Sequence, residues 1–313
     1  MPTINKKYIW LGFIGVSLVS VIYLSLNLRT QNETLKTIIP VVSVTPPLIQ
    51  PPKEVKVGSI EIDPSLIWPE TKDLASYQAT IGSVDLIATA QKMADVLKVS
   101  RKSNTPPAWS DNEYTRYMTI DSENGIIKYQ IDGYAKPELY AGKNLTTLPQ
   151  AAVAAQTFVK NFSIWSEYKL DTSSIHYTSG ETSLASVSFY PLFKDYFLSF
   201  DNQVQAPLII EVGQKNTVVV VTYIPKNLNV SSIPIEALLV SKEEALQKIT
   251  SGQILPMDLR DYKLTTENTK QINRIVVDKV VLEYRVISSQ GKAYPFYRIM
   301  GQGVFYLVPA IRI

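Results

Sequence analysis

The stretch VVDKVVLEYRVISSQGKAYPFYRIMGQGVFYLVPAI, residues 276–311, decides the fold class of this 313-residue chain. Its first apolar positions are Val276, Val280, Leu282, Tyr284 and Val286, and they alternate with the charged residues Lys279, Glu283 and Arg285. A period of two predicts a strand with one apolar face and one solvated face. Two further strand patterns, residues 294–300 and 304–311, complete an expected antiparallel sheet.

Two hairpins are predicted upstream of this stretch. Residues 114–121 and 126–131 flank Asn124-Gly125, a dipeptide that favours the tight turn between antiparallel strands. Residues 208–212 and 218–224 flank a Gly-containing connection and have the same strand character.

Three amphipathic helices are expected, each followed by strands. The first opens at Ser83 as N-cap, the second starts near Pro149, and the third is capped by Ser241 and Glu244 and ends at Gly252. The apolar face of the first helix holds Leu86, Ala90, Met93, Ala94 and Leu97. That of the second holds Ala152, Ala155, Phe158, Val159 and Phe162, and that of the third holds Ala245, Leu246 and Ile249. The order of a helix followed by hairpin strands, recurring three times, predicts an α+β fold of helix-plus-antiparallel-sheet units.

An uncharged run of 21 residues begins at Tyr8 and ends at Leu28. As a helix it is long enough to cross the hydrocarbon core of a bilayer, roughly 30 Å thick. Its length and the absence of a small-x-small cleavage pattern favour an uncleaved signal-anchor over a signal peptide. Lys6 and Lys7 slightly favour a cytoplasmic N-terminus and an extracytoplasmic C-terminal domain at the cell membrane.

Residues 30–56 contain five prolines, which disfavour a helix and are typical of a linker. The chain is therefore expected to divide into a cytoplasmic leader (1–7), a single-pass transmembrane segment (8–28), a Pro-rich linker (29–58) and three α+β units (59–146, 147–235 and 236–313).

Composition excludes several classes of function. The chain has 31 Lys and Arg against 28 Asp and Glu, and three of those cations, Lys6, Lys7 and Arg29, flank the apolar run. The rest of the chain is neutral, so nucleic acid is not an expected partner. With no Cys and one His, His176, the sequence lacks thiolate nucleophiles and most His-based sites, and no cofactor or metal is expected.

Ser-Lys catalysis is the nucleophilic chemistry that this composition leaves open. Ser166 and Lys169, and likewise Ser289 and Lys292, have the Ser-x-x-Lys spacing, but the accompanying S-D-N and K-T-G motifs are absent. We expect a protein that is not an enzyme.

Aromatic residues are frequent in the C-terminal strands and form the candidate partner surface. Its residues are Tyr294, Phe296, Tyr297, Phe305 and Tyr306. Such a cluster could bind a peptide, a glycan or a partner protein. Cross-strand packing in the core is the alternative, and a half-buried antiparallel sheet favours it for any single residue.

Three runs of the sequence carry a resemblance to a known family. They are residues 189–200 (FYPLFKDYFLSF), residues 239–252 (LVSKEEALQKITSG), and the closing strands with VVLEYRV, YPFYRI and YLVPAI. Together with the single membrane segment they resemble the YycH/YycI-type regulatory proteins of two-component systems, whose extracytoplasmic lobes are PepSY-like. The resemblance covers about the last 165 residues and the anchor.

This resemblance implies a non-enzymatic, membrane-anchored protein of the cell envelope that binds another membrane or envelope protein and regulates a sensor kinase. Two alternatives stay open: an envelope hydrolase that uses Ser and Lys, and a structural module that binds peptidoglycan or a protease.

Overall fold

The computed structural model describes residues 56–70, 74–140, 146–178, 184–200, 206–235, 238–254, 257–258, 271–301 and 304–312. The predicted leader, membrane segment and most of the linker lie outside these residues. Among the described residues, no helix has the length and apolar character needed to cross a membrane. Residues from Pro51 to Ile313 form one compact unit.

Short helices are interspersed among many strands along the described part of the chain. The helices are α2 (Leu86–Leu97), α3 (Leu148–Val159) and α4 (Lys242–Thr250), with short 3-10 turns η1 (Pro137–Leu139), η2 (Ser163–Trp165), η3 (Gln214–Asn216) and η4 (Ser288–Gln290). The first nine strands are β1 (Lys56–Ile62), β2 (Ser76–Gly82), β3 (Ser100–Asn104), β4 (Pro107–Ser110), β5 (Arg116–Asp121), β6 (Ile126–Ile131), β7 (Tyr168–Leu170), β8 (His176–Tyr177) and β9 (Ala185–Phe193). The others are β10 (Tyr196–Phe200), β11 (Leu208–Val212), β12 (Val218–Tyr223), β13 (Asn227–Ile235), β14 (Met257–Asp258), β15 (Gln271–Val277), β16 (Lys279–Ile287), β17 (Lys292–Gly301) and β18 (Val304–Pro309).

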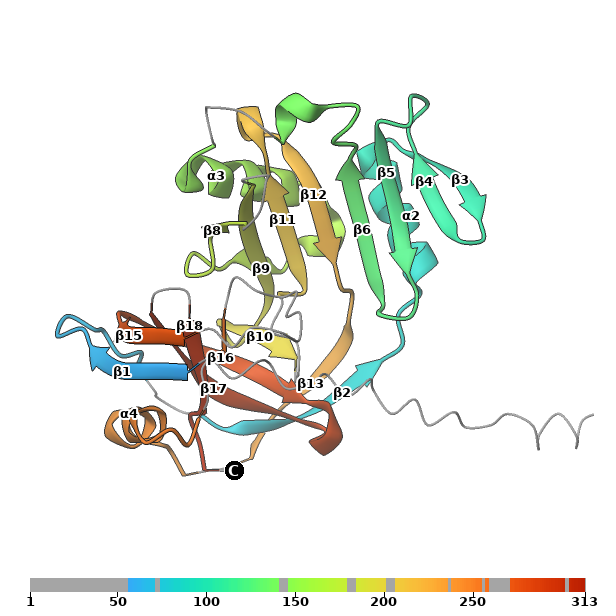
Figure 1. Cartoon of the computed structure of the whole chain (residues 1–313). Helices are drawn as coiled ribbons and strands as arrows, with labels where there is room; N and C mark the ends of the chain where they lie inside the picture. Colours follow the sequence, from blue (N-terminus) through green and yellow to red (C-terminus); the bar gives the residue numbers. More distant parts are fainter. Residues whose placement is uncertain are drawn as a thin grey trace, which may run out of the picture. The chain divides into compact units, whose positions relative to one another are not determined.

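Sixteen of these strands form one sheet, whose main path runs β13-β2-β17-β16-β10-β9-β11-β12-β6-β5-β4-β3. The strands β9 and β10 join its two parts through the turn Lys194-Asp195 (Figure 1). The α+β class is confirmed. The expectation of purely antiparallel pairing is corrected, because β10 pairs with β16 in parallel and β1 pairs with β15 in parallel in a separate sheet.

The locally encoded hairpins form as the sequence predicts. β5 and β6 pair antiparallel around Asn124-Gly125, where Gly125 has a φ of +67°. β11 and β12 pair antiparallel as well, and β12 also pairs with β6, so both hairpins lie in one sheet. Gly125 adopts its left-handed angle at no steric cost, whereas in the β11–β12 connection the left-handed residues are Lys215 and Asn216, each with a φ of 57°.

The helices differ from expectation in their caps. The N-cap of α2 is Asp85, whose carboxylate accepts from Ala88 N, and not Ser83. Thr147 caps α3 in a full capping box with Gln150. Ser241 caps α4 as predicted, but the carboxylate of Glu244 binds Lys248 and Arg312 in place of completing the box.

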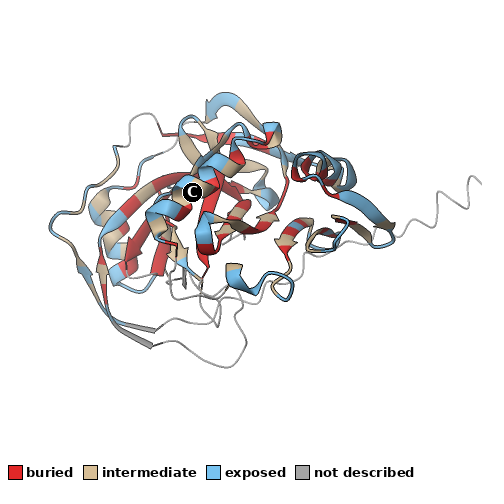
Figure 2. Ribbon diagram, turned by 90° about the horizontal axis from the view of Figure 1, so that it is seen from above, coloured by how far each residue is buried: buried red, intermediate tan, exposed pale blue. Residues whose placement is uncertain are grey.

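Helices α2 and α3 cover the same face of the part of the sheet that runs β9-β11-β12-β6-β5-β4-β3 (Figure 1). Helix α4 packs against β18. Buried residues follow the strands and the sheet-facing sides of the helices (Figure 2). The first core contains Met93, Trp109, Ile127, Ala155 and Phe189. The second contains Leu282, Ile299 and Tyr306, and a third lies around Tyr77 and Tyr284. The division into three units stays a prediction.

The charged face of β16 is buried, which corrects the sequence prediction. Lys279 is exposed, but Glu283 and Arg285 are 1% and 5% exposed. Arg285 Nη1 donates to Glu283 Oε1 at 2.9 Å, and Arg285 Nη2 donates to the carbonyl of Phe200 at 3.0 Å. Buried charges persist when they are paired in this way.

Candidate binding cleft

Two neighbouring clefts open where α2 and α3 meet the sheet. The α2 cleft, of about 830 Å³, is lined among others by Asp95, Lys98, Ser110, Glu113, Arg116 and Lys136. The α3 cleft, of about 840 Å³, is lined among others by Tyr129, Val153, Ala154, Phe158, Thr217 and Val218. Arg116 and Ile131 line both, so the two clefts meet at these residues.

Asp111 organises the loop between β4 and β5. Its carboxylate accepts from Thr115 N at 2.8 Å, from Thr115 Oγ1 at 2.7 Å and from Arg116 N at 3.2 Å. Arg116 Nε donates to Asp111 Oδ2 at 3.0 Å, and Arg116 Nη1 donates to the carbonyl of Leu97 at 3.3 Å. The guanidinium is thereby fixed between the end of α2 and the start of β5.

Electrostatics keep this pair charged. Partial burial opposes ionisation of Asp111, but hydrogen bonds from Thr115 and Arg116 outweigh it and lower its pKa to about 2. The hydrogen bond to Asp111 likewise raises the pKa of Arg116. The Arg116 side chain is 38% exposed, and the residue lines both clefts.

Ser110 supplies a polar group without a partner. The residue is 5% exposed, and its Oγ makes no hydrogen bond to any described residue. A buried hydroxyl without a partner costs about 1–3 kcal/mol, so such groups are uncommon. Ser110 is among the residues that line the α2 cleft.

The α3 cleft is mainly apolar. Tyr129 and Ile131 on β6 form its floor, while Val153 and Phe158 on α3 line its side. Val153 is 64% exposed. Burial raises the pKa of the Tyr129 hydroxyl, so it stays neutral at physiological pH.

The predicted aromatic surface lies mostly in the second core. Tyr294, Tyr297, Phe305 and Tyr306 are between 0% and 6% exposed, and Phe296 is partly buried against the same core. The ring of Tyr297 also packs against that of Trp68 in a tilted arrangement, with the ring centroids 4.8 Å apart. These exposures favour the alternative of cross-strand packing, and a partner surface at these residues stays a prediction.

Three of the four residues considered for catalysis are exposed: Ser166 and Lys169 around η2 and β7, and Ser289 in η4. Lys292, at the start of β17, is half-buried. The exposed Lys169 is not the desolvated lysine that Ser-Lys chemistry requires. His176, on the short strand β8, lies 2.8 Å through Nδ1 from the carbonyl of Ser174.

No group of three or more metal-ligating side chains gathers among the described residues. The Asp121 carboxylate accepts hydrogen bonds from the backbone and the side chain of Asn124, and these bonds close the hairpin turn.

Ser110, Asp111 and Arg116 are not among the site residues predicted from the sequence. The local signal was an Asp directly after a strand, followed four and five residues later by Thr115 and Arg116, a spacing that lets one carboxylate close a loop. The burial of Ser110 depends on the packing of α2 and has no local signal.

Comparisons with known proteins give fold neighbours only. No family model matches the chain, and no curated protein matches it. YycH from Bacillus subtilis is similar with a TM-score of 0.41 and 10% identity, over 74% of this chain and 50% of that one. An uncharacterized protein from Eubacterium rectale ATCC 33656 is similar with a TM-score of 0.45 and 12% identity, over 81% of this chain and 91% of that one.

The chain thus spans about half the length of the YycH structure. YycH is one of the proteins that give their name to the family that the sequence resembles. Membership of that family stays a prediction, because neither a family model nor a curated sequence matches.

Proposed function

We propose that this protein is a non-enzymatic, membrane-anchored binding protein of the cell envelope that regulates a partner. The sequence resemblance implies that this partner is a sensor kinase. The observation that carries the binding role is the pair of clefts that meet at Arg116. The uncharged run at residues 8–28 supports the anchor, and the charge bias beside it supports an extracytoplasmic C-terminal domain.

The cleft suits recognition because its polar centre is built in advance. Asp111 holds Arg116 by hydrogen bonds, so little side-chain entropy is lost when a ligand arrives. The apolar floor beside it offers contact area, and a mixture of apolar surface with a few fixed polar groups is typical of binding pockets.

Site-specific photo-crosslinking tests the binding role. Val153→p-benzoylphenylalanine places a crosslinker at the exposed edge of the α3 cleft in the full-length protein in its native membranes. Lys128→p-benzoylphenylalanine is the matched control, since Lys128 is exposed on β6 and points to the face opposite Tyr129. A membrane or envelope protein crosslinked only from position 153 supports the proposal, and equal crosslinking from both positions contradicts it.

A second experiment tests the anchor. Residues 8–28 are replaced by an unrelated membrane helix, and the partner is recovered in mild detergent. Loss of the partner assigns the contact to the native helix, whereas unchanged recovery assigns it to the C-terminal domain. Retention on cell-wall sacculi without a protein partner would instead support the structural module that binds peptidoglycan.

A further inference from the structure

We propose that this protein has a hinge between two lobes, and that the ion pair between Asp171 and Arg298 holds the lobes in the arrangement that the structure shows. The hinge lies in β9, at Tyr190 and Pro191. A rotation about it changes the position of both clefts relative to β1, the first described strand after the linker. The hinge is a property of the fold and does not depend on the proposed function.

The hydrophobic cores divide the described chain from residue 56 onward into two lobes. The first core and both clefts belong to the cleft lobe, which comprises the described residues within 83–190 and 206–224. Tyr196 packs against both the second and the third core, and these cores belong to the base lobe, which comprises the described residues within 56–82, 192–200 and 225–312. Among the described residues, none of the first core belongs to either of the other two. Figure 1 shows the lobes above and below the junction of β9 and β10.

Strand β9 changes its partner at the boundary between the lobes. Residues 185–189 pair with β11 in the cleft lobe, and Leu192 and Phe193 pair with β10 in the base lobe. Tyr190 and Pro191 lie between these two ladders and pair with β7. Pro191 has no N–H and cannot donate a ladder hydrogen bond at this point. Hinges are typically a few residues at such boundaries between elements.

The turn that follows is fixed to the base lobe. Lys194 donates from Nζ to the hydroxyl of Tyr77 at 2.8 Å, and the ammonium group lies 4.4 Å from the centre of the same ring. Tyr77 is 1% exposed and belongs to the third core. The turn therefore moves with the base lobe, which places the hinge before it, at Tyr190 and Pro191.

One ion pair joins the lobes beside the hinge. Asp171 of the cleft lobe accepts from Nη2 of Arg298, on β17 of the base lobe, at 2.6 Å, and both side chains are at most 4% exposed. The Arg298 guanidinium also lies 5.6 Å from the centre of the Tyr190 ring. By contrast, the ion pairs Arg116–Asp111 and Arg285–Glu283 each lie within one lobe.

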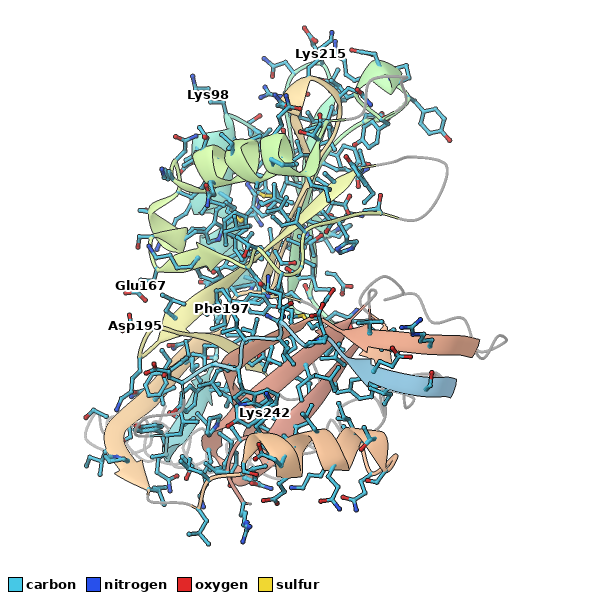
Figure 3. All side chains as sticks on the ribbon, turned by 90° about the vertical axis from the view of Figure 1, so that its left-hand side faces the viewer. Lys98, Glu167, Asp195, Phe197, Lys215 and Lys242 are labelled. Atoms are coloured by element: carbon cyan, nitrogen blue, oxygen red, sulfur yellow. The ribbon has the colours of Figure 1, made fainter. Side chains whose placement is uncertain are left out.

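Aromatic contact across the boundary is also close to the hinge. Figure 3 shows Phe197 at the level where the lobes meet, between Lys98 and Lys215 on the cleft lobe and Lys242 on the base lobe. The rings of Phe197 and Tyr190 have centroids 5.5 Å apart. A rotation about Tyr190 and Pro191 displaces these two rings little, because they lie beside the axis.

A charged contact suits a boundary that opens. Separating apolar surfaces exposes them to water at a cost in free energy, whereas separated ions regain the hydration that burial removed. Nε of Arg298 lies 3.3 Å from Glu283 Oε2 in its own lobe, so this cation keeps a partner when Asp171 leaves. Asp171 likewise keeps the hydrogen bond from the hydroxyl of Ser173. Lobes joined by a boundary of this kind are expected to move relative to one another.

Distances between spin labels test the hinge. The chain has no Cys, so labels attach only at introduced cysteines. Lys92→Cys on α2 with Gln247→Cys on α4 spans the two lobes, and Lys92→Cys with Lys128→Cys on β6 lies within the cleft lobe. All three positions are exposed. Pulsed electron paramagnetic resonance of the full-length protein in detergent gives the distance distribution of each pair.

The variant Asp171→Asn removes the charge that faces Arg298 and keeps the shape of the side chain. Loss of a charged hydrogen bond shifts a two-state equilibrium by about 10- to 100-fold, so the distribution between the lobes should broaden or gain a second maximum. The distribution within the cleft lobe should stay unchanged. Asp111→Asn is the matched control, because its ion pair with Arg116 lies inside one lobe, and it should leave the distribution between the lobes as in the wild type.

A second variant tests the hinge with every ion pair intact. Pro191→Gly gives the backbone more freedom at the hinge and should also broaden the distribution between the lobes. An unchanged distribution in Asp171→Asn would overturn the role of the ion pair, and an unchanged distribution in both variants would overturn the hinge. Equal broadening within and between the lobes would show one indivisible unit and would overturn it as well. Crosslinking from Val153 is a separate readout, so the hinge and the binding role can fail independently.

Discussion

Arg298 on β17 donates from Nη2 to Asp171 Oδ2 at 2.6 Å, although 127 residues separate them in the sequence. Both side chains are at least 96% buried. Arg298 Nε also lies 3.3 Å from Glu283 Oε2, and its guanidinium lies over the ring of Tyr190. Burial opposes the charge, but the two carboxylates outweigh it and raise the pKa of Arg298.

Removing the Arg298 side chain should therefore destabilise the folded protein. Arg298→Leu leaves Asp171 and Glu283 buried without their cation, and we expect a loss of about 3–5 kcal/mol in the free energy of unfolding. Urea unfolding followed by tryptophan fluorescence measures it. Arg274→Leu is the matched control, since its pair with Glu61 is exposed and should contribute less than about 1 kcal/mol. Equal losses would contradict the interpretation.

The Asp111 carboxylate should make stability depend on acid pH. Its pKa falls from an ordinary 3.8 to about 2 on folding, so ionisation stabilises the folded state above about pH 4, and this contribution is lost as pH falls toward 2. Compared with Asp111→Asn, the wild type should be more stable by a constant amount from pH 7 to 5, and the difference should shrink below pH 4. A difference unchanged at pH 2.5 would argue against this ionisation.

Gly301 allows two strands to approach closely. A Cβ at this position would lie 2.0 Å from the carbonyl oxygen of Val276 on β15, a backbone atom that cannot move away cheaply. Gly301→Ala should destabilise by about 1–3 kcal/mol, as overpacking does. Gly133→Ala serves as the comparison, because its Cβ would meet the ring of Tyr140 at 3.5 Å, an ordinary contact. Thermal unfolding of both variants should rank them in this order.

The turn between β9 and β10 holds two non-glycine residues, Lys194 and Asp195, in a left-handed conformation. Asp195 is exposed with a φ of 68°, so Asp195→Gly should stabilise by about 0.5–1 kcal/mol. Gly125→Ala should do the opposite, because Gly125 has a φ of +67° with open space around it and only backbone strain would change. A drop in melting temperature for Asp195→Gly would show that the aspartate side chain contributes more than its backbone costs.

Local features could be predicted from the sequence. Asn124-Gly125 specifies a turn through its own backbone preference, and Ser241 caps α4 through a hydrogen bond to Glu244 N three residues away. Contacts of this kind need no knowledge of the rest of the chain.

Features that depend on distant partners could not be predicted. The alternation along β16 identifies its apolar face correctly. Glu283 is nevertheless buried, because Arg285 and Arg298 both pair with its carboxylate. Asp171, far away in the sequence, is the second carboxylate that pairs with Arg298. In the clefts, the Asp111 loop is local and could have been recognised, whereas the buried hydroxyl of Ser110 requires the position of α2.

The position of β2 has a consequence for synthesis. β2, at residues 76–82, lies between β13 and β17, and its partners Lys292 and Ala293 on β17 are made more than 200 residues later. At roughly 5–20 residues per second, the ribosome needs on the order of 10–40 s to supply them. During that interval the edge of β2 that pairs with β17 has no native neighbour, and an unpaired strand edge of this kind is open to wrong pairing.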